Sequence, residues 1–277
     1  MAKATPISPE QEIDSSSLPG SKELGLLGVT GDAVVFTGRG IRGIAHVGPF
    51  AGEVLRQAAV LAVGSVLVIM AIAFLAGGSC GLESTFLARQ FGFAPVAGGF
   101  STWCTLREVV PFVFGYILAA KVGCGMVAEI GAMQANEEVD ALETIGVRSI
   151  PYLVSTRMLA AAIVLPGAYI LAVASAYTAA YLMSVIRFGD VSQGTWELFF
   201  FNFQDISDLI YSVVKGMVIA GFVVSTALFF GYRVRGGPVE VGVATARSMA
   251  VNIVGVTFIS MLGTLIFWGA NPRIPIG

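Results

Sequence analysis

Long apolar stretches without charged residues constrain this chain more than any other feature. Hydrophobic residues make up 56% of its 277 residues, charged residues only 12%, and the mean hydropathy is +0.82. A soluble domain carries about twice that share of charge, roughly 25%. Uncharged windows close to the ~20 residues that a spanning helix needs recur along the chain. They predict an all-α integral membrane protein with five spans, at about 58–77, 109–126, 158–186, 209–230 and 251–270.

The placement of lysine and arginine predicts the orientation of these spans. If the N-terminus is cytoplasmic, eleven of the 16 Lys and Arg residues fall on the inner side and five on the outer side. Positive residues concentrate on the cytoplasmic side of membrane proteins. We therefore expect a cytoplasmic N-terminus and an external C-terminus in the cell (inner) membrane. The outer segment 192–206 is rich in Trp and Phe, and we expect it to pack at the level of the lipid headgroups.

The region before the first span divides into two parts. Residues 1–30 are polar and contain a cluster of Ser, Pro and Gly, which predicts a disordered cytoplasmic tail without a secretory signal. Residues 34–54 are mixed in character, and glycines interrupt them too often for a span. Their apolar side chains are spaced roughly as one helical face, which predicts a segment lying in the membrane interface: Phe36, Ile41, Val47, Phe50 and Val54.

An acidic segment joins the second and third spans and holds five of the chain's 18 carboxylates. On a helix that turns 100° per residue, the acidic residues Glu137, Asp140 and Glu143 share one side. The opposite arc is apolar and consists of Val139, Leu142 and Ile145, with Glu138 interrupting it and Gly146 as the predicted helix stop. A helix lying on lipid would favour Lys or Arg on its polar face. This cytoplasmic helix is therefore predicted to meet a basic protein partner.

Several charged residues fall at membrane depth. Arg107 and Glu108 lie at the outer start of the second span, Lys121 near its inner end, and Lys215 near the outer end of the fourth span. Such charges are costly in lipid and commonly face a bundle interior or a water-filled path. Alternatively, the long side chains of Arg107 and Lys121 reach to opposite interfaces. About 21 Å of helix separates these two residues, so they cannot form one ion pair.

Other motifs do not predict chemistry in this chain. The pattern G-x-G-x-x-G at 38–43 lacks the alternating strands and helices of a dinucleotide site. No phosphate-binding loop of the G-x-x-x-x-G-K-[ST] type is present, so ATP is not expected to bind here. With His46 as the single histidine, neither a zinc site nor a catalytic triad is predicted. The three cysteines, Cys80, Cys104 and Cys124, are interpreted as small packing residues without a disulfide.

A longer string of residues carries a resemblance to a known family. It runs from Leu-Arg-Glu-x-x-Pro at 106–111, through Ala-Glu-Ile-Gly-Ala-Met at 128–133 and Glu-Glu-Val-Asp-Ala-Leu-Glu at 137–143, to Gly-Val at 146–147 and Tyr-Leu-Val with Arg157 at 152–157. This string resembles the MlaE/YrbE permeases, the membrane subunits of lipid-transporting ABC systems that work with MCE-domain proteins. The resemblance implies one permease domain over residues 31–277.

The resemblance also implies partners and roles for individual residues. A separate ATPase would bind the ATP, so the chain itself would be neither an enzyme nor a cofactor protein. The ATPase would dock on Glu137, Glu138, Asp140, Leu142, Glu143 and Gly146. Lipid would pass Arg107, Glu108 and Lys215 in a cavity between two permeases, below an external MCE assembly. Nothing in the sequence predicts a nucleic-acid partner.

Departures from the family pattern bear on the second permease. Gln134 stands where the family often has Arg, Glu138 where it often has Gln, and Lys121 where Arg is usual. Together with the polar tail they resemble the actinobacterial YrbE type, in which two unlike permeases pair, so a heterodimer is expected. A secondary transporter or channel is the main alternative function, because intramembrane charges also serve ion coupling. A further alternative function is that of a structural assembly factor without a transport path.

Overall fold

The computed structural model describes residues 26–189 and 191–269, which are helical throughout apart from short connections and contain no strand. The α-helices are α1 (Leu26–Gly43), α2 (Ala51–Gln90), α3 (Ala97–Trp103), α4 (Val110–Ile117), α5 (Cys124–Ala135), α6 (Glu138–Thr144), α7 (Thr156–Tyr181), α8 (Gln193–Asn202), α9 (Ile206–Tyr232) and α10 (Pro238–Trp268). Four π-helical segments continue these helices, at Cys104–Val109, Leu118–Gly123, Ile150–Ser155 and Leu182–Arg187. The all-α prediction is confirmed.

Five continuous helical rods are long and apolar enough to cross a membrane. They run over Gly48–Gln90, Ala94–Ala135, Ile150–Arg187, Ile206–Tyr232 and Pro238–Trp268. Each contains one of the five predicted spans, except that residue 270 of the last one lies outside the described residues. The 40 residues of α2 correspond to about 60 Å of helix, twice the ~30 Å hydrocarbon core. The rods therefore extend the bundle beyond the apolar layer.

The five rods differ in how far they are buried within the protein. In their most apolar windows, 56% of the second rod and 50% of the fourth are buried, against 22% of the first and 17% of the last. The second and fourth rods therefore form the centre of the bundle. The first and last rods, which contain α2 and α10, expose apolar faces to lipid or to another protein.

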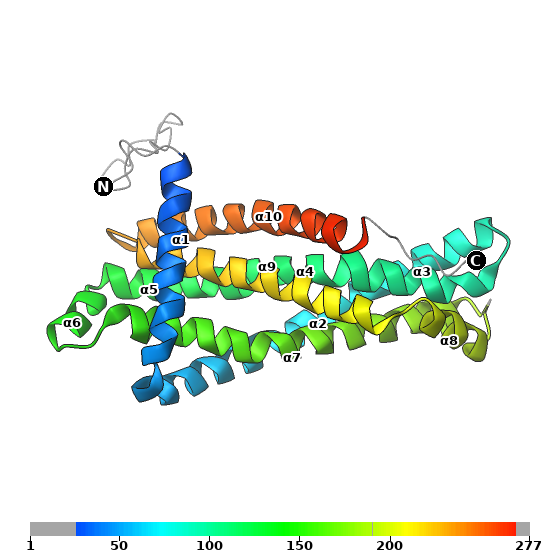
Figure 1. Cartoon of the computed structure of the whole chain (residues 1–277), viewed down its shortest axis with the longest axis horizontal. Helices are drawn as coiled ribbons and strands as arrows, with labels where there is room; N and C mark the ends of the chain where they lie inside the picture. Colours follow the sequence, from blue (N-terminus) through cyan, green and yellow to red (C-terminus); the bar gives the residue numbers. More distant parts are fainter. Residues whose placement is uncertain (1–25, 190, 270–277) are drawn as a thin grey trace, which may run out of the picture.

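The helix α1 crosses one end of the bundle at a steep angle to the other helices, as Figure 1 shows. This arrangement agrees with the interfacial segment predicted at 34–54, whose later residues form two short 3₁₀ turns before α2. Because α1 begins at Leu26, residues 26–30 are helical and do not belong to a tail. The rest of the predicted tail lies outside the described residues. The helix α6 lies at the same end as α1, and α3 and α8 lie at the opposite end (Figure 1).

Two glycines of the rejected dinucleotide motif, Gly40 and Gly43, have a packing role, whereas Gly38 has open space around it. They lie within a helix, α1, and not in a strand-to-helix turn. The backbone of α1 at Gly40 accepts a hydrogen bond of 2.7 Å from the Ser155 hydroxyl, and side chains at Gly40 and Gly43 would collide with the start of the third rod. Small residues at these positions let α1 lie close against the bundle.

The closest approach between long helices joins α2 to α7. A Cβ atom at Gly77 or Gly81 would overlap the backbone of Ala176 or Ala180. These positions are spaced four residues apart on both helices, which is the small-residue pattern that brings membrane helices into close contact. The two helices consequently pack extensively against each other.

The cysteine prediction was wrong for two of the three residues. Cys80 of α2 and Cys104, which follows α3, form a disulfide across 24 residues of sequence, and Cys124 is free. The spacing of the cysteines carries no signal for this pair. Only the antiparallel packing of the first two rods brings them together, at the end that the predicted orientation places outside. Disulfides persist on that oxidising side of a membrane.

The aromatic residues of segment 192–206 pack inside the protein as well as at its surface. Trp196 and Phe200 of α8 are buried and contact Tyr181 and Tyr177 of α7, at ring-centroid distances of 5.2 and 4.8 Å. Among the aromatic residues of segment 192–206, only Phe201 is strongly exposed. The segment therefore builds a small core of its own at the α3–α8 end.

Candidate functional site

Arg107 forms a largely buried ion pair between the second and fourth rods. Its Nη2 lies 3.0 Å from the Asp208 carboxylate, and the two side chains are only 12% and 9% exposed. The indole of Trp268 donates a hydrogen bond of 2.7 Å to the other oxygen of Asp208. The guanidinium also lies over the Trp103 ring, 4.6 Å from its centroid. Arg107 thus points into the protein and does not snorkel.

Lys215 lies beside this pair and is fully buried. Its ammonium donates to the Arg107 carbonyl at 2.8 Å and to the Thr264 hydroxyl at 2.7 Å, and it lies 3.3 Å from the Glu108 carboxylate. Glu108 also accepts a hydrogen bond from Thr264. Its side chain is 49% exposed, so the cluster reaches the protein surface beside α10.

The structure thus brings together all three residues that were predicted for the substrate path. Two ion pairs with no net charge lie next to each other, joined through the Arg107 backbone. The Nε of Arg107 is buried and has no hydrogen-bond partner among the described residues. A paired cluster with a spare donor and an exposed carboxylate can contact a polar group at membrane depth without leaving a charge unpaired.

Sequence reasoning missed the residues that complete this cluster. Asp208 is the acidic partner of Arg107, and Trp268 and Thr264 come from the last rod. Asp208 and Lys215 are seven residues apart, which places them on the same face of α9 within about 20°. In the sequence, this seven-residue spacing was the signal that could have identified Asp208 as a neighbour of Lys215. Nothing local indicated that this face meets Arg107, since more than 100 positions separate Arg107 from its acidic partner.

The helix α6 was predicted to be the partner-docking element, and its end has the expected geometry. Gly146 has a φ of +85°, which favours glycine. The Val147 amide bonds the Leu142 carbonyl at 3.0 Å, and the Gly146 amide bonds the Glu143 carbonyl at 3.0 Å. These two bonds form a Schellman motif. The predicted helix stop at Gly146 is confirmed.

The faces of α6 differ in detail from the helical projection. The helix covers Glu138–Thr144, and Glu137 precedes it with a left-handed φ of 58°, so Glu137 does not share the helical arc of Asp140 and Glu143. The predicted apolar arc is divided. Val139 is buried against the bundle, Leu142 is half-buried and Ile145 is 74% exposed. Glu138 is exposed and accepts a bond of 3.4 Å from Asn136.

Hydrogen bonds attach the α6 region to the fourth rod. The Ser149 hydroxyl bonds both the Glu143 carboxylate and the Tyr232 hydroxyl, the latter at 2.8 Å. The Gln134 amide donates to the Tyr232 carbonyl at 2.9 Å. A hollow of about 410 Å³ lies between the end of α6 and the start of the third rod, lined by Glu143 and residues 146–151. If a partner displaced α6, these hydrogen bonds would therefore pass the movement on to the end of α9.

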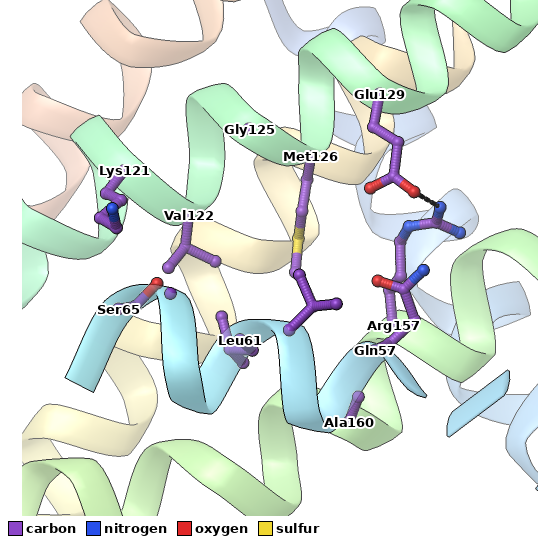
Figure 2. A pocket seen from close by; sticks show the side chains of 12 residues that line it. Gln57, Leu61, Ser65, Lys121, Val122, Gly125, Met126, Glu129, Arg157 and Ala160 are labelled. Carbon is purple, nitrogen blue, oxygen red and sulfur yellow. Dashed lines mark hydrogen bonds and ion pairs between the residues drawn. The ribbon is translucent and has the colours of Figure 1, made fainter. Parts of the chain in front are cut away.

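A second charged group lies near the α6 end, away from the Arg107 cluster. Glu129 of α5 and Arg157 of α7 form an ion pair of 2.6 Å at the edge of a cavity between α2, α5 and α7, shown in Figure 2. Lys121 lines the same cavity and has no ion pair among the residues described. Lys121 therefore belongs to a different site from Arg107, as their separation along the helix required.

A multi-pass helical bundle with a buried charged cluster at one end and an exposed acidic helix at the other defines a class, the membrane-embedded subunit of a transport system. The match to a known family is more specific. The model of the MlaE permease family matches residues 54–266, which include α6 and every residue of the Arg107 cluster except Trp268. The chain belongs to this family of permeases and is a multi-pass inner-membrane protein.

Named relatives share about a quarter of their residues with this chain. The intermembrane phospholipid transport system permease protein MlaE of Haemophilus influenzae is 27% identical over 217 residues, 78% of this chain and 83% of its own length. A probable ABC transporter permease protein of Rickettsia bellii is 27% identical over 216 residues, again 78% and 83%. The chloroplastic protein TRIGALACTOSYLDIACYLGLYCEROL 1 of Arabidopsis thaliana is 27% identical, over 71% of this chain and 59% of its own length.

Proposed function

We propose that this chain is the permease subunit of a lipid ABC transporter and that phospholipid is its substrate class. The observation that carries the proposal is the doubly paired cluster of Arg107, Asp208, Lys215 and Glu108 at membrane depth. Intramembrane charges of this kind are costly and mark substrate pathways. Membership of the MlaE family and the similarity to the phospholipid transport permease of H. influenzae support a phospholipid over an inorganic ion.

The lipid path runs along the surface where Glu108 and Thr264 leave the cluster, beside α10. The last rod is mostly unburied and carries exposed apolar side chains, among them Val254, Phe258 and Leu265. A second permease, unlike this one in sequence, covers that surface, so that the lipid passes through a cavity between the two permeases. Lipid headgroups pass Arg107 and Glu108, and acyl chains contact the apolar side chains of α10. MCE-domain proteins continue the path on the outer side.

Energy for transport comes from a separate ATPase that docks on α6. The exposed residues there include the carboxylates of Glu137, Glu138, Asp140 and Glu143, together with Ile145 and Gly146. Carboxylates complement lysine and arginine of a partner, and one buried aliphatic side chain contributes about 1.5–3 kcal/mol. The bonds through Ser149 and Tyr232 transmit movement of α6 to α9, which carries Asp208 and Lys215.

The test uses the complete transporter, purified with its ATPase and reconstituted in liposomes. Glu108→Gln keeps the shape of the side chain at the surface of the cluster and one of its two accepting oxygens, but removes its charge. We expect ATP-driven phospholipid transfer to fall several-fold while the complex stays assembled. Glu197→Gln, on α8 and outside the cluster, is the matched control and should transfer lipid normally.

Two results would contradict the proposed function. One is normal transfer by both Glu108→Gln and Arg107→Ala in an intact complex. The other is ion conductance by the purified chain without an ATPase, which would support a channel.

A further inference from the structure

The cavity between α2, α5 and α7 lies at the opposite end of the membrane helices from the Arg107 cluster. It has a volume of about 270 Å³. As Figure 2 shows, Lys121 and Ser65 face each other at one end of it, and the Glu129–Arg157 pair lies above Gln57 at the other end. None of these residues takes part in the Arg107 cluster or in α6.

The charges around this cavity do not balance. Glu129 is neutralised by Arg157, whereas Lys121 is exposed and has no acidic partner among the described residues. Outside the lining residues, the nearby carboxylate of Glu53 is already paired with Arg56 at 2.8 Å. Lys121 thus leaves one positive charge in excess beside the cavity. A cation within a membrane rod needs an anion or water next to it.

Arg157 provides a second reason to expect an anion. Its side chain is 2% exposed, and it donates to the Leu153 carbonyl and to Glu129. Its Nε has no hydrogen-bond partner among the described residues. A guanidinium carries five N–H donors in a planar fork that suits phosphate oxygens. Besides the uncompensated Lys121, the lining of the cavity therefore includes a guanidinium that has an unused buried N–H.

An apolar strip continues from the cavity along α2. Val60 and Gly64 line the cavity, and Val63 and Leu67 share one helical face with them, within an arc of about 100°. Val63 is 86% exposed and Leu67 is 76% exposed. The strip runs from the cavity toward the Arg107 end of the bundle. A polar cavity joined to an exposed apolar strip fits a molecule with a phosphate at one end and a hydrocarbon chain at the other.

We propose that this cavity binds the phosphate headgroup of an anionic phospholipid from the leaflet at the α6 end, with an acyl chain on the α2 strip. The phosphate lies beside Lys121 and Ser65, and the rest of the polar headgroup extends through the cavity toward Arg157. A lipid with one net negative charge balances the one excess positive charge of the site. This binding is separate from the Arg107 cluster and does not depend on transport.

The experiment measures lipid retained by the purified full complex after reconstitution in nanodiscs of mixed phosphatidylglycerol and phosphatidylcholine. Native mass spectrometry then counts the phosphatidylglycerol molecules that stay bound. Lys121→Glu should lower the number of bound phosphatidylglycerol molecules per permease by one, because it reverses the uncompensated charge. Lys121→Arg keeps the positive charge and should retain the normal number. Arg235→Glu, an exposed cation between α9 and α10, is the matched control and should retain the normal number.

A second variant tests the cavity without changing charge. A side chain at Gly64 meets no atom within 4 Å, so Gly64→Leu should fold and should obstruct the cavity mouth. We expect the same loss of one phosphatidylglycerol. Unchanged retention in both Lys121→Glu and Gly64→Leu would overturn the proposal. Displacement of the lipid by millimolar inorganic phosphate would assign the site to a free anion, and loss of permease pairing without loss of lipid would assign it to a protein interface.

Discussion

The two ends of the bundle are held together in different ways. At the α3–α8 end, the Cys80–Cys104 disulfide, the buried Arg107–Asp208 pair and the aromatic core around Trp196 connect the helices. At the α1–α6 end, the acidic helix is exposed, a cavity separates α2 from α5, and Lys121 has no described acidic partner. The charges of the α3–α8 end are paired within the chain, whereas the α1–α6 end leaves charged side chains for partners.

This difference matches the work expected of each end. Charges inside a membrane are stable only when paired, so the Arg107 cluster must be complete within the chain. An element that receives a partner must remain accessible and movable. The α6 region meets this need because a few hydrogen bonds attach it to α9, and Val139 is the one buried side chain of α6.

The largest expected effect concerns which end lies outside the cell. Single cysteines at Gly194 and Arg235, introduced into a Cys124→Ala background, report on the two ends. A membrane-impermeant maleimide should label position 194 completely and leave position 235 unlabelled on intact cells, as the bias of Lys and Arg requires. The reverse pattern would place the disulfide and the aromatic core inside and α6 outside.

Asp208→Leu should lower stability strongly, because it leaves the Arg107 guanidinium buried without its carboxylate. Breaking a buried pair costs about 3–5 kcal/mol. Thermal unfolding in detergent measures the loss, and the double variant Arg107→Leu, Asp208→Leu should recover much of it. Glu83→Leu, at an exposed carboxylate of α2 near the same end of the bundle, is the control. If the single and double variants are equally unstable, the pair does not hold this end together.

Leu142→Asp should detach the ATPase, since it places a charge on the apolar side of α6. Loss of one buried leucine removes about 1.5–3 kcal/mol, a ten- to hundredfold weaker association. Recovery of the ATPase with the tagged permease measures it, and correct membrane insertion is checked first. Because Ile145 is 74% exposed, Ile145→Asp should have a similar effect. Full ATPase recovery by both variants would mean that α6 is only a loop element.

Removing the disulfide should have a moderate effect confined to one end. Cys80→Ser should cost about 2 kcal/mol, at the low side of the usual range, because helices persist in the unfolded membrane state. The presence of the disulfide is measured by counting the thiols of the denatured protein that react with a maleimide–polyethylene glycol. One thiol, Cys124, should react before reduction and all three afterwards. Three reactive thiols before reduction would show that this end lacks the cross-link.

Glu143→Ala should have the smallest effect on ATPase docking. An exposed ion pair contributes only about 0.2–1 kcal/mol, and the side chain also accepts a bond from Ser149. We expect ATPase recovery to fall by less than about fivefold. Ser149→Ala removes the internal bond and leaves the carboxylate, so comparing the two variants separates docking from local structure. A complete loss of the ATPase in Glu143→Ala would indicate a buried pair.

The sequence by itself determined the helical class, the five spans and the helix stop at Gly146. These features follow from local rules: hydrocarbon thickness sets the length of an apolar run, and a left-handed C-terminal residue favours glycine. It also marked Arg107, Glu108 and Lys215, because charge within an apolar run is visible without any structure. Membership of the MlaE family rested on residues that are close together in the chain.

Only the tertiary structure decided which of these residues meet. The partner of Arg107 is Asp208, which lies 101 positions away, and the disulfide joins two cysteines whose spacing carries no signal. The division of the α6 apolar arc, with Val139 buried and Ile145 exposed, likewise depends on how the bundle packs beneath it. Periodicity along one helix fixes which residues share a face. What that face contacts depends on packing between rods that are distant in sequence, and no local pattern records it.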